Sequence, residues 1–192
     1  MTIGIIGLGL IGGSLAKALK FSGVELVLGY DISESVVLKA KLLGAIDREL
    51  TEKDLQNCDL TIVALYPGAT VEYVQSHARL FKKGSIVIDT CGVKETVCTP
   101  LFKTAEENGF IFVGAHPMAG IELSGFEHSN ANMFNKASMI IVPPDVIDLV
   151  ILDKLKKLFI SIGFTDIKIT TPKNHDKMIA YTSQLAHVVS NA

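Results

Sequence analysis

Cysteine is scarce in this 192-residue sequence, and neither sign of charge dominates it. A formal net charge of −2 gives no electrostatic attraction to nucleic acid or to an anionic membrane, so we expect neither as a partner. No apolar run is long enough to cross a bilayer, and residues 1–7 lack the basic start and cleavage site of a signal peptide. The three cysteines, Cys58, Cys91 and Cys98, show no metal-ligand spacing. We therefore expect reduced thiols, no metal site and a cytoplasmic location.

Short apolar runs alternate with helical patterns along most of the sequence. The runs are rich in Ile, Val and Leu and lack polar alternation, which is typical of strands covered on both faces of a parallel sheet. We predict strands over residues 2–6, 25–30, 59–65, 85–89, 110–115, 138–142 and 166–169. Helices are predicted between residues 11 and 23, 33 and 44, 69 and 80, 94 and 108, and 146 and 162. This alternation predicts an α/β fold with a doubly wound, mostly parallel sheet of the Rossmann type.

A glycine-rich turn follows the first predicted strand. Gly7, Gly9 and Gly12 have the G-x-G-x-x-G spacing, and they lie between a predicted strand and a predicted helix. Gly7 allows a tight turn, Gly9 lets the backbone approach a pyrophosphate, and Gly12 lets the helix pack closely on the strand. The first helical residues, Leu10 and Ile11, offer backbone N–H groups and the positive end of the helix dipole to the phosphates. In this context the spacing predicts a dinucleotide site.

An acidic residue ends the second predicted strand. Asp31 lies 19 residues after Gly12, where a carboxylate can accept hydrogen bonds from the adenosine ribose hydroxyls and repel a 2′-phosphate. Ile32 and Ser33 follow it, and no Lys or Arg is close enough in the sequence to neutralise such a phosphate. The sequence therefore favours NAD over NADP, while a carboxylate at this point can also be an ordinary turn residue.

The pattern changes after Thr171 and Pro172. Residues 175–192 show unbroken helical spacing, which runs to the last residue without a glycine, a proline or a basic last turn. We therefore divide the chain into a dinucleotide-binding domain, residues 1–171, and the start of a helical substrate and dimerisation domain, residues 172–192. We expect the sequence to be the N-terminal portion of a longer protein.

His116 is the histidine whose position suggests catalysis. It follows the apolar strand predicted over residues 110–115, and ligands of open α/β sheets bind beyond the carboxyl ends of the strands. Imidazole titrates near neutral pH, so it can accept a proton from a hydroxyl group during an oxidation. The pattern alone leaves a structural role equally open. For His175 and Asp176, which begin the last predicted helix, we expect capping or local hydrogen bonding.

Four segments carry a family resemblance. They are Gly7-Leu8-Gly9-Leu10-Ile11-Gly12-Gly13-Ser14, residues 89–94, Gly114-Ala115-His116-Pro117-Met118-Ala119-Gly120 and Ser183-Gln184-Leu185-Ala186-His187. Together they resemble the prephenate dehydrogenases, NAD-linked enzymes of tyrosine biosynthesis, and the His-Pro-Met-Ala-Gly segment is the most specific of them. The resemblance covers the whole chain. It implies a dinucleotide domain followed by the first helix of an all-helical dimerisation domain, with a homodimer as the expected assembly.

The resemblance also implies a reaction, the oxidative decarboxylation of prephenate to 4-hydroxyphenylpyruvate. A hydride would pass from the ring carbon bearing the hydroxyl to NAD, the ring carboxylate would leave as carbon dioxide, and aromatisation would drive the step. By carry-over from the family, His116 would accept the proton of the substrate hydroxyl. Ser183 and His187 would position the substrate, and Glu122 would have a secondary role near the pocket entrance.

The sequence departs from the family pattern at three places. Gly92 stands where the family commonly has a serine that orients the histidine and the nicotinamide. Thr90 or Cys91 is the candidate to replace that serine, and we assign Thr90 to cofactor binding. Ile121 stands where many relatives have threonine. An arginine expected to bind a substrate carboxylate would lie beyond Ala192.

Three other functions stay open on the sequence. Arogenate could replace prephenate, because the contacts that distinguish the two are expected around the substrate side chain and beyond this chain. A β-hydroxyacid dehydrogenase would share the Rossmann start and a helical second domain but has no evident need for His116. A non-catalytic nucleotide-sensing module would bind NAD without turnover, as this chain alone could also do.

Overall fold

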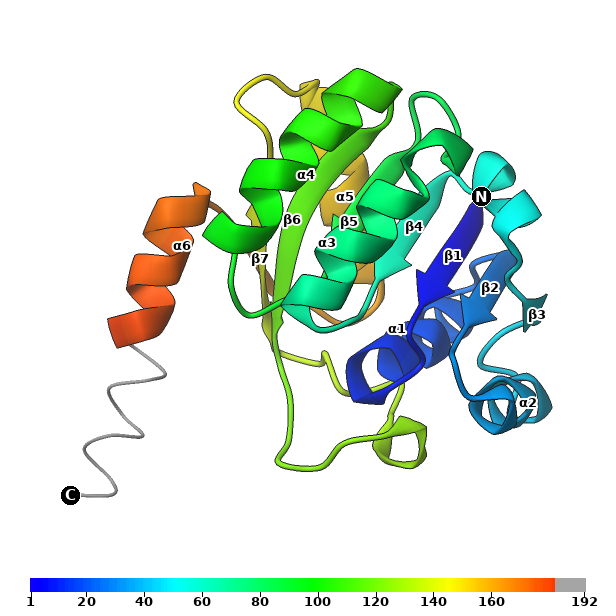
Figure 1. Cartoon of the computed structure of the whole chain (residues 1–192). Helices are drawn as coiled ribbons and strands as arrows, with labels where there is room; N and C mark the ends of the chain where they lie inside the picture. The colour runs from blue at the N-terminus through cyan, green and yellow to red at the C-terminus, as the bar shows by residue number, and fades with distance from the viewer. Residues whose placement is uncertain (182–192) are drawn as a thin grey trace.

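A single sheet runs through the molecule (Figure 1). The computed structural model describes residues 1–181, and its strands are β1 (Thr2–Ile6), β2 (Leu26–Tyr30), β3 (Arg48–Glu49), β4 (Leu60–Val63), β5 (Ile86–Asp89), β6 (Ile111–Met118), β7 (Ser138–Val142) and β8 (Asp166–Ile169). Their order in the sheet is β3-β2-β1-β4-β5-β6-β7-β8. β1 to β6 are parallel, whereas β7 pairs antiparallel with β6 and parallel with β8. The mostly parallel sheet that the sequence predicted is confirmed.

Helices cover both faces of this sheet. They are α1 (Leu10–Phe21), α2 (Glu34–Leu42), α3 (Pro67–Ser76), α4 (Glu95–Asn108), α5 (Leu149–Ser161) and α6 (Pro172–Ile179), with short 3₁₀ turns η1 (Glu52–Asn57), η2 (Ala78–Leu80) and η3 (Phe126–His128). Buried side chains of α1, α2 and α5 pack together on one face, and those of α3 and α4 pack on the other. Figure 1 shows α3 and α4 in front of the sheet, with α1 and α5 behind it. None of the helices within residues 1–181 is long and apolar enough to cross a membrane.

The strand that carries His116 is longer than the sequence predicted. The pattern placed its end at Ala115, but β6 continues to Met118 because residues 114–118 pair antiparallel with β7. His116 therefore lies within the strand rather than after it, opposite Ile140 of β7. Sequence periodicity cannot show such pairing, since the partner strand begins 20 residues after Met118.

The helix starts also differ from the prediction. α6 begins at Pro172 rather than at residue 175, and the Thr171 side chain accepts a hydrogen bond from the backbone N–H of Asn174 at its start. α5 begins at Leu149 rather than at residue 146, because the Asp148 carboxylate accepts from the Val150 N–H. The proposed division of the chain at residues 171 and 172 stays a prediction.

The direction of winding reverses between β1 and β4, which are neighbours in the sheet. The chain leaves β1 toward β2 on one side, and it leaves β4 toward β5 on the other. A crevice forms at the carboxyl ends of strands that diverge in this way, and this is where open α/β sheets bind their ligands. The loop that starts at Gly7 and the loop that starts at Ala64 border this crevice.

Candidate active site

A groove of about 510 Å³ occupies the crevice. Its walls come from the segments that follow β1, β2, β4 and β5, and from residues 123–125. All seven residues that the sequence assigned to the cofactor line it: Gly7, Gly9, Leu10, Ile11, Gly12, Asp31 and Thr90. Five separate segments of the sequence therefore meet at one groove.

The three motif glycines have different steric surroundings. Gly7 has a φ of +85°, and a Cβ on it would lie 2.6 Å from the Ala64 carbonyl oxygen. A Cβ on Gly12 would lie 1.9 Å from the Gly7 carbonyl oxygen, so only glycine lets α1 approach the turn this closely. A Cβ on Gly9 would meet no atom within 4 Å, so this backbone stays open to a ligand. The first turn of α1 carries no acidic residue that would oppose a bound phosphate.

Asp31 holds the glycine turn against the end of β2. Its carboxylate accepts hydrogen bonds from the backbone N–H of Leu8 at 2.8 Å and from that of Ser33 at 2.9 Å. The sequence suggested a ribose contact and did not reveal this anchoring role. A carboxylate has about four acceptor sites, so both roles are compatible.

His116 lies beside the groove, next to Gly92. Its Nε2 would be 3.7 Å from a Cβ built on Gly92, which itself lines the groove. The His116 side chain is half-buried. The absence of a side chain at residue 92 thus leaves open space directly beside the imidazole.

A second histidine contacts the other side of the His116 ring. Nδ1 of His116 is 2.9 Å from Nε2 of His175, and Nδ1 of His175 is 2.7 Å from a carboxylate oxygen of Asp176. His175 is fully buried. The sequence predicted capping or local hydrogen bonding for His175 and Asp176. The local bond between them is present, but the contact of His175 with His116, 59 residues away, was not predicted.

Asp176 also caps a helix, though not its own. Its two carboxylate oxygens accept from the backbone N–H groups of Lys94 at 2.7 Å and Glu95 at 2.9 Å, at the start of α4. This cap attaches α6 to the start of α4, and Figure 1 shows these two helix starts on the same side of the molecule. The sequence could not predict this contact, because an adjacent His-Asp pair at the start of one helix does not indicate that the Asp will cap a different helix.

The protonation states in this chain of contacts follow from burial and charge. Burial, the adjacent His175 and the Lys94 ammonium lower the pKa of His116 to about 4. Burial also lowers the pKa of His175, despite its hydrogen bond to Asp176. Burial disfavours the ionised carboxyl of Asp176, but hydrogen bonds from the Glu95 N–H and from His175 outweigh this effect and lower its pKa. At pH 7 both imidazoles are therefore neutral and the carboxylate is ionised.

A buried ion pair fixes the backbone next to His116. Lys94 and Asp89 are both fully buried and contact each other directly. The Lys94 ammonium also donates to the Ala115 carbonyl at 2.7 Å, while Asp89 accepts from the Ala115 N–H at 3.1 Å and from the Cys91 N–H at 2.9 Å. Residues 89–94 are thus joined to β6 one residue before His116. The sequence analysis did not identify this pair.

The remaining predicted site residues have varied positions. Glu122 is exposed in the segment between β6 and η3, and it does not line the groove, although the following residues 123–125 do. The Cys91 thiol is buried and hydrogen-bonds Thr70 and the Leu65 carbonyl oxygen, and burial raises its pKa to about 12. Thr90 lines the groove. Ser183 and His187 lie outside the described residues.

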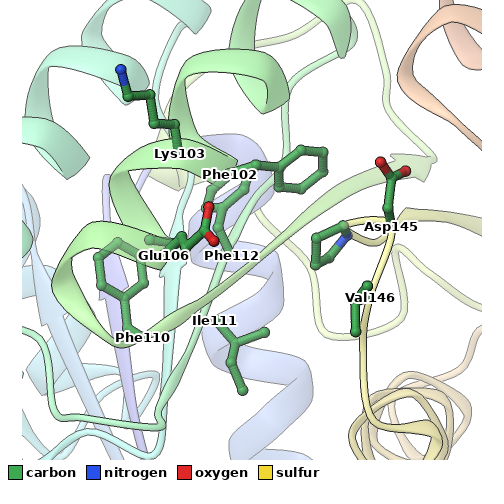
Figure 2. Close-up of a pocket in the computed structure, with 10 residues that line it drawn as sticks. Phe102, Lys103, Glu106, Phe110, Ile111, Phe112, Asp145 and Val146 are labelled. Carbon is green, nitrogen blue, oxygen red and sulfur yellow. The ribbon is translucent and has the colours of Figure 1, made fainter.

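Another hollow, of about 480 Å³, lies between α4 and β6 (Figure 2). Phe102 and Phe112 pack edge to face in its wall, with ring centroids 6.0 Å apart. Ile111 at its base begins β6, so this hollow lies at the amino end of the strand. The chemistry-bearing residues lie at the opposite edge of the sheet, where ligands of this architecture bind.

Comparison with known proteins agrees with this geometry. Residues 15–167 match the family model described as "Prephenate dehydrogenase, nucleotide-binding domain". The chain belongs to this family. The resemblance found in the sequence is thereby confirmed.

The chain is similar to curated proteins and to solved structures. It is 31% identical over 193 residues to the cyclohexadienyl dehydrogenase of Zymomonas mobilis, covering 98% of this chain and 64% of that protein. Prephenate dehydrogenase from Aquifex aeolicus, solved with hydroxyphenyl propionate and NAD⁺, superposes with a TM-score of 0.84 at 29% identity, covering 98% and 66% of the two chains. Synechocystis arogenate dehydrogenase gives a TM-score of 0.89 at 27% identity, covering 96% and 65%. The chain thus spans just under two thirds of the length of each.

Proposed function

We propose that the protein is an NAD-dependent dehydrogenase that converts prephenate to 4-hydroxyphenylpyruvate in tyrosine biosynthesis. The observation that carries the proposal is the position of His116, whose Nε2 lies beside Gly92 at the wall of the dinucleotide groove. A hydroxyl oxidised at this point would have a proton acceptor next to it. Membership of the family and the similarity to an enzyme solved with NAD⁺ support the same assignment.

The groove fits a dinucleotide. The open backbone at Gly9 and the start of α1 would hold the pyrophosphate, the Asp31 carboxylate would accept from the adenosine ribose, and Thr90 would lie toward the nicotinamide. No Lys or Arg is found among the described residues that line the groove, which supports NAD over NADP. When bound, the nicotinamide supplies the hydride acceptor.

The residues of this chain handle one proton and the alignment of the substrate. The substrate hydroxyl would donate to Nε2 of His116. The imidazole would take this proton as the hydride leaves the ring carbon that bears the hydroxyl. The ring carboxylate then departs as carbon dioxide, and aromatisation of the ring provides the driving force. We assign substrate contacts to Ser183 and His187, and a secondary contact to Glu122, on the basis of the family pattern.

Arogenate is the second candidate substrate, since it undergoes the same chemistry and a similar solved structure is an arogenate dehydrogenase. The assay for both is NADH formation at 340 nm by the full-length protein, with NAD and either prephenate or arogenate. We expect turnover with at least one of them and little with NADP. No turnover with either substrate would refute the proposed function.

We further propose a cytoplasmic homodimer assembled through the helical domain. The free, buried cysteines Cys58, Cys91 and Cys98 are compatible with a reducing compartment. Light scattering during size-exclusion chromatography of the full-length protein tests the assembly. A monomer at micromolar concentration would rule the dimer out.

A further inference from the structure

We propose that His175 and Asp176 of α6 are positioning residues, which hold His116 in the tautomer that can accept a proton and stabilise the imidazolium it becomes. The inference rests on the proposed function, because it explains how His116 acts as a base. It arises from three side chains in a row: Asp176, His175 and His116.

The hydrogen bonds in this row can run in only one direction. The ionised Asp176 carboxylate has no proton to donate, so Nδ1 of His175 must carry the hydrogen between them. Neutral His175 then has a lone pair on Nε2, and it accepts from Nδ1–H of His116. This leaves the lone pair of His116 on Nε2, the atom that faces Gly92 and the groove.

Because His175 is buried, a water molecule cannot easily take its place as the hydrogen-bond acceptor for His116. The His175 side chain is fully buried, so water has no access from which to take over the acceptor role. If His175 were absent, His116 could place its hydrogen on Nε2 instead. That tautomer has no lone pair directed at the substrate hydroxyl and cannot act as the base.

The charges around His116 also give Asp176 a role. Within residues 1–181, the charged or titratable groups that face the ring are His175 and Asp176 from α6 and Lys94 from the start of α4. Lys94 is already paired with Asp89 of β5. Among these described groups, Asp176 is the unneutralised counter-charge to a positive charge formed on His116, and it acts through His175. The Lys94 and Glu95 N–H groups hold that carboxylate in place.

The first test measures tautomers and needs no turnover. Nitrogen NMR spectra of the full-length protein, labelled with ¹⁵N-histidine and assigned with His116→Asn, should show His116 and His175 both protonated on Nδ1 at pH 7. In His175→Phe, which keeps a ring but removes the acceptor, His116 should shift toward the Nε2–H tautomer. A wild-type His116 protonated on Nε2, or an unchanged tautomer in His175→Phe, would overturn the proposal.

The second test separates positioning from helix capping. Asp176→Asn keeps a capping oxygen but removes the charge, so we expect kcat to fall about 10²-fold, with KM for NAD nearly unchanged. The acid limb of kcat/KM should move to lower pH, because the carboxylate raises the pKa of His116. Asp148→Asn, at the exposed cap of α5, is the matched control and should change only the melting temperature.

The outcomes distinguish this inference from the proposed function. If Asp176→Asn lowers the melting temperature as Asp148→Asn does but leaves kcat and the pH profile unchanged, Asp176 is only a cap and the inference is wrong. If the wild-type protein turns over neither substrate, the proposed function fails first, while the tautomer measurement still decides whether the row of hydrogen bonds exists.

Discussion

Lys94→Met should destabilise the protein far more than any exposed charge substitution. The variant removes the ammonium from a fully buried pair and leaves the Asp89 carboxylate without a counter-charge in the core. Breaking a buried pair in this way costs about 3–5 kcal/mol. We expect about 3 kcal/mol, the lower end, because Asp89 keeps its hydrogen bonds from the N–H groups of Cys91 and Ala115.

Urea unfolding followed by circular dichroism measures this loss as a lower midpoint at an unchanged m-value. The control is Lys103→Met on α4, whose side chain is 78% exposed and whose ion pair with Glu107 spans 3.8 Å. That variant should change the free energy of unfolding by less than about 0.5 kcal/mol. The double variant Asp89→Asn with Lys94→Met should be more stable than Lys94→Met alone, because no bare charge is then buried.

Two results would refute the reasoning. A loss below about 1 kcal/mol in Lys94→Met would mean that the Asp89 charge is not confined to the core. A double variant whose loss of stability equals the sum of the losses in Asp89→Asn and Lys94→Met would mean that the two side chains do not interact. Lys94→Met should also lower turnover, because Ala115 would lose its contact with the ammonium immediately before His116.

Three further predictions concern the groove and its base. His116→Asn should leave NAD affinity within about twofold and lower kcat by about 10²–10⁴-fold. In the wild-type protein, the acid limb of kcat/KM should fall near pH 4 rather than near 6.5, because a pKa of about 4 keeps His116 neutral above that pH. An acid limb at pH 6 or higher would contradict this. Gly12→Ala should abolish NAD binding by calorimetry and lower the melting temperature, whereas Gly68→Ala, with no atom within 4 Å of its Cβ, should do neither. Asp31→Asn should reduce the preference for NAD over NADP about 10-fold, which corresponds to the removal of about 1.4 kcal/mol of repulsion between the carboxylate and the 2′-phosphate. Unchanged selectivity in binding assays would argue against a contact between Asp31 and the ribose.

The sequence by itself determined the fold class and the set of predicted cofactor residues that meet in one groove. Apolar runs of strand length, helical spacing and glycine turns are local properties, so they predicted most strands and helices and the turn at Gly7. The general rule for open α/β sheets then placed Asp31, Thr90 and His116 at the same edge of the sheet. Here the structure brings the predicted cofactor residues to one groove and His116 beside it.

Only the tertiary structure decided how His116 is held. Its strand extends past Ala115 because β7 pairs with it, and its Nδ1 meets His175 because the Asp176 carboxylate docks α6 on the start of α4. The pair Lys94 and Asp89 reaches Ala115 through the order of β5 and β6 in the sheet. Local periodicity does not encode contacts between side chains tens of residues apart. These depend on which strands become neighbours and on how helices dock on them.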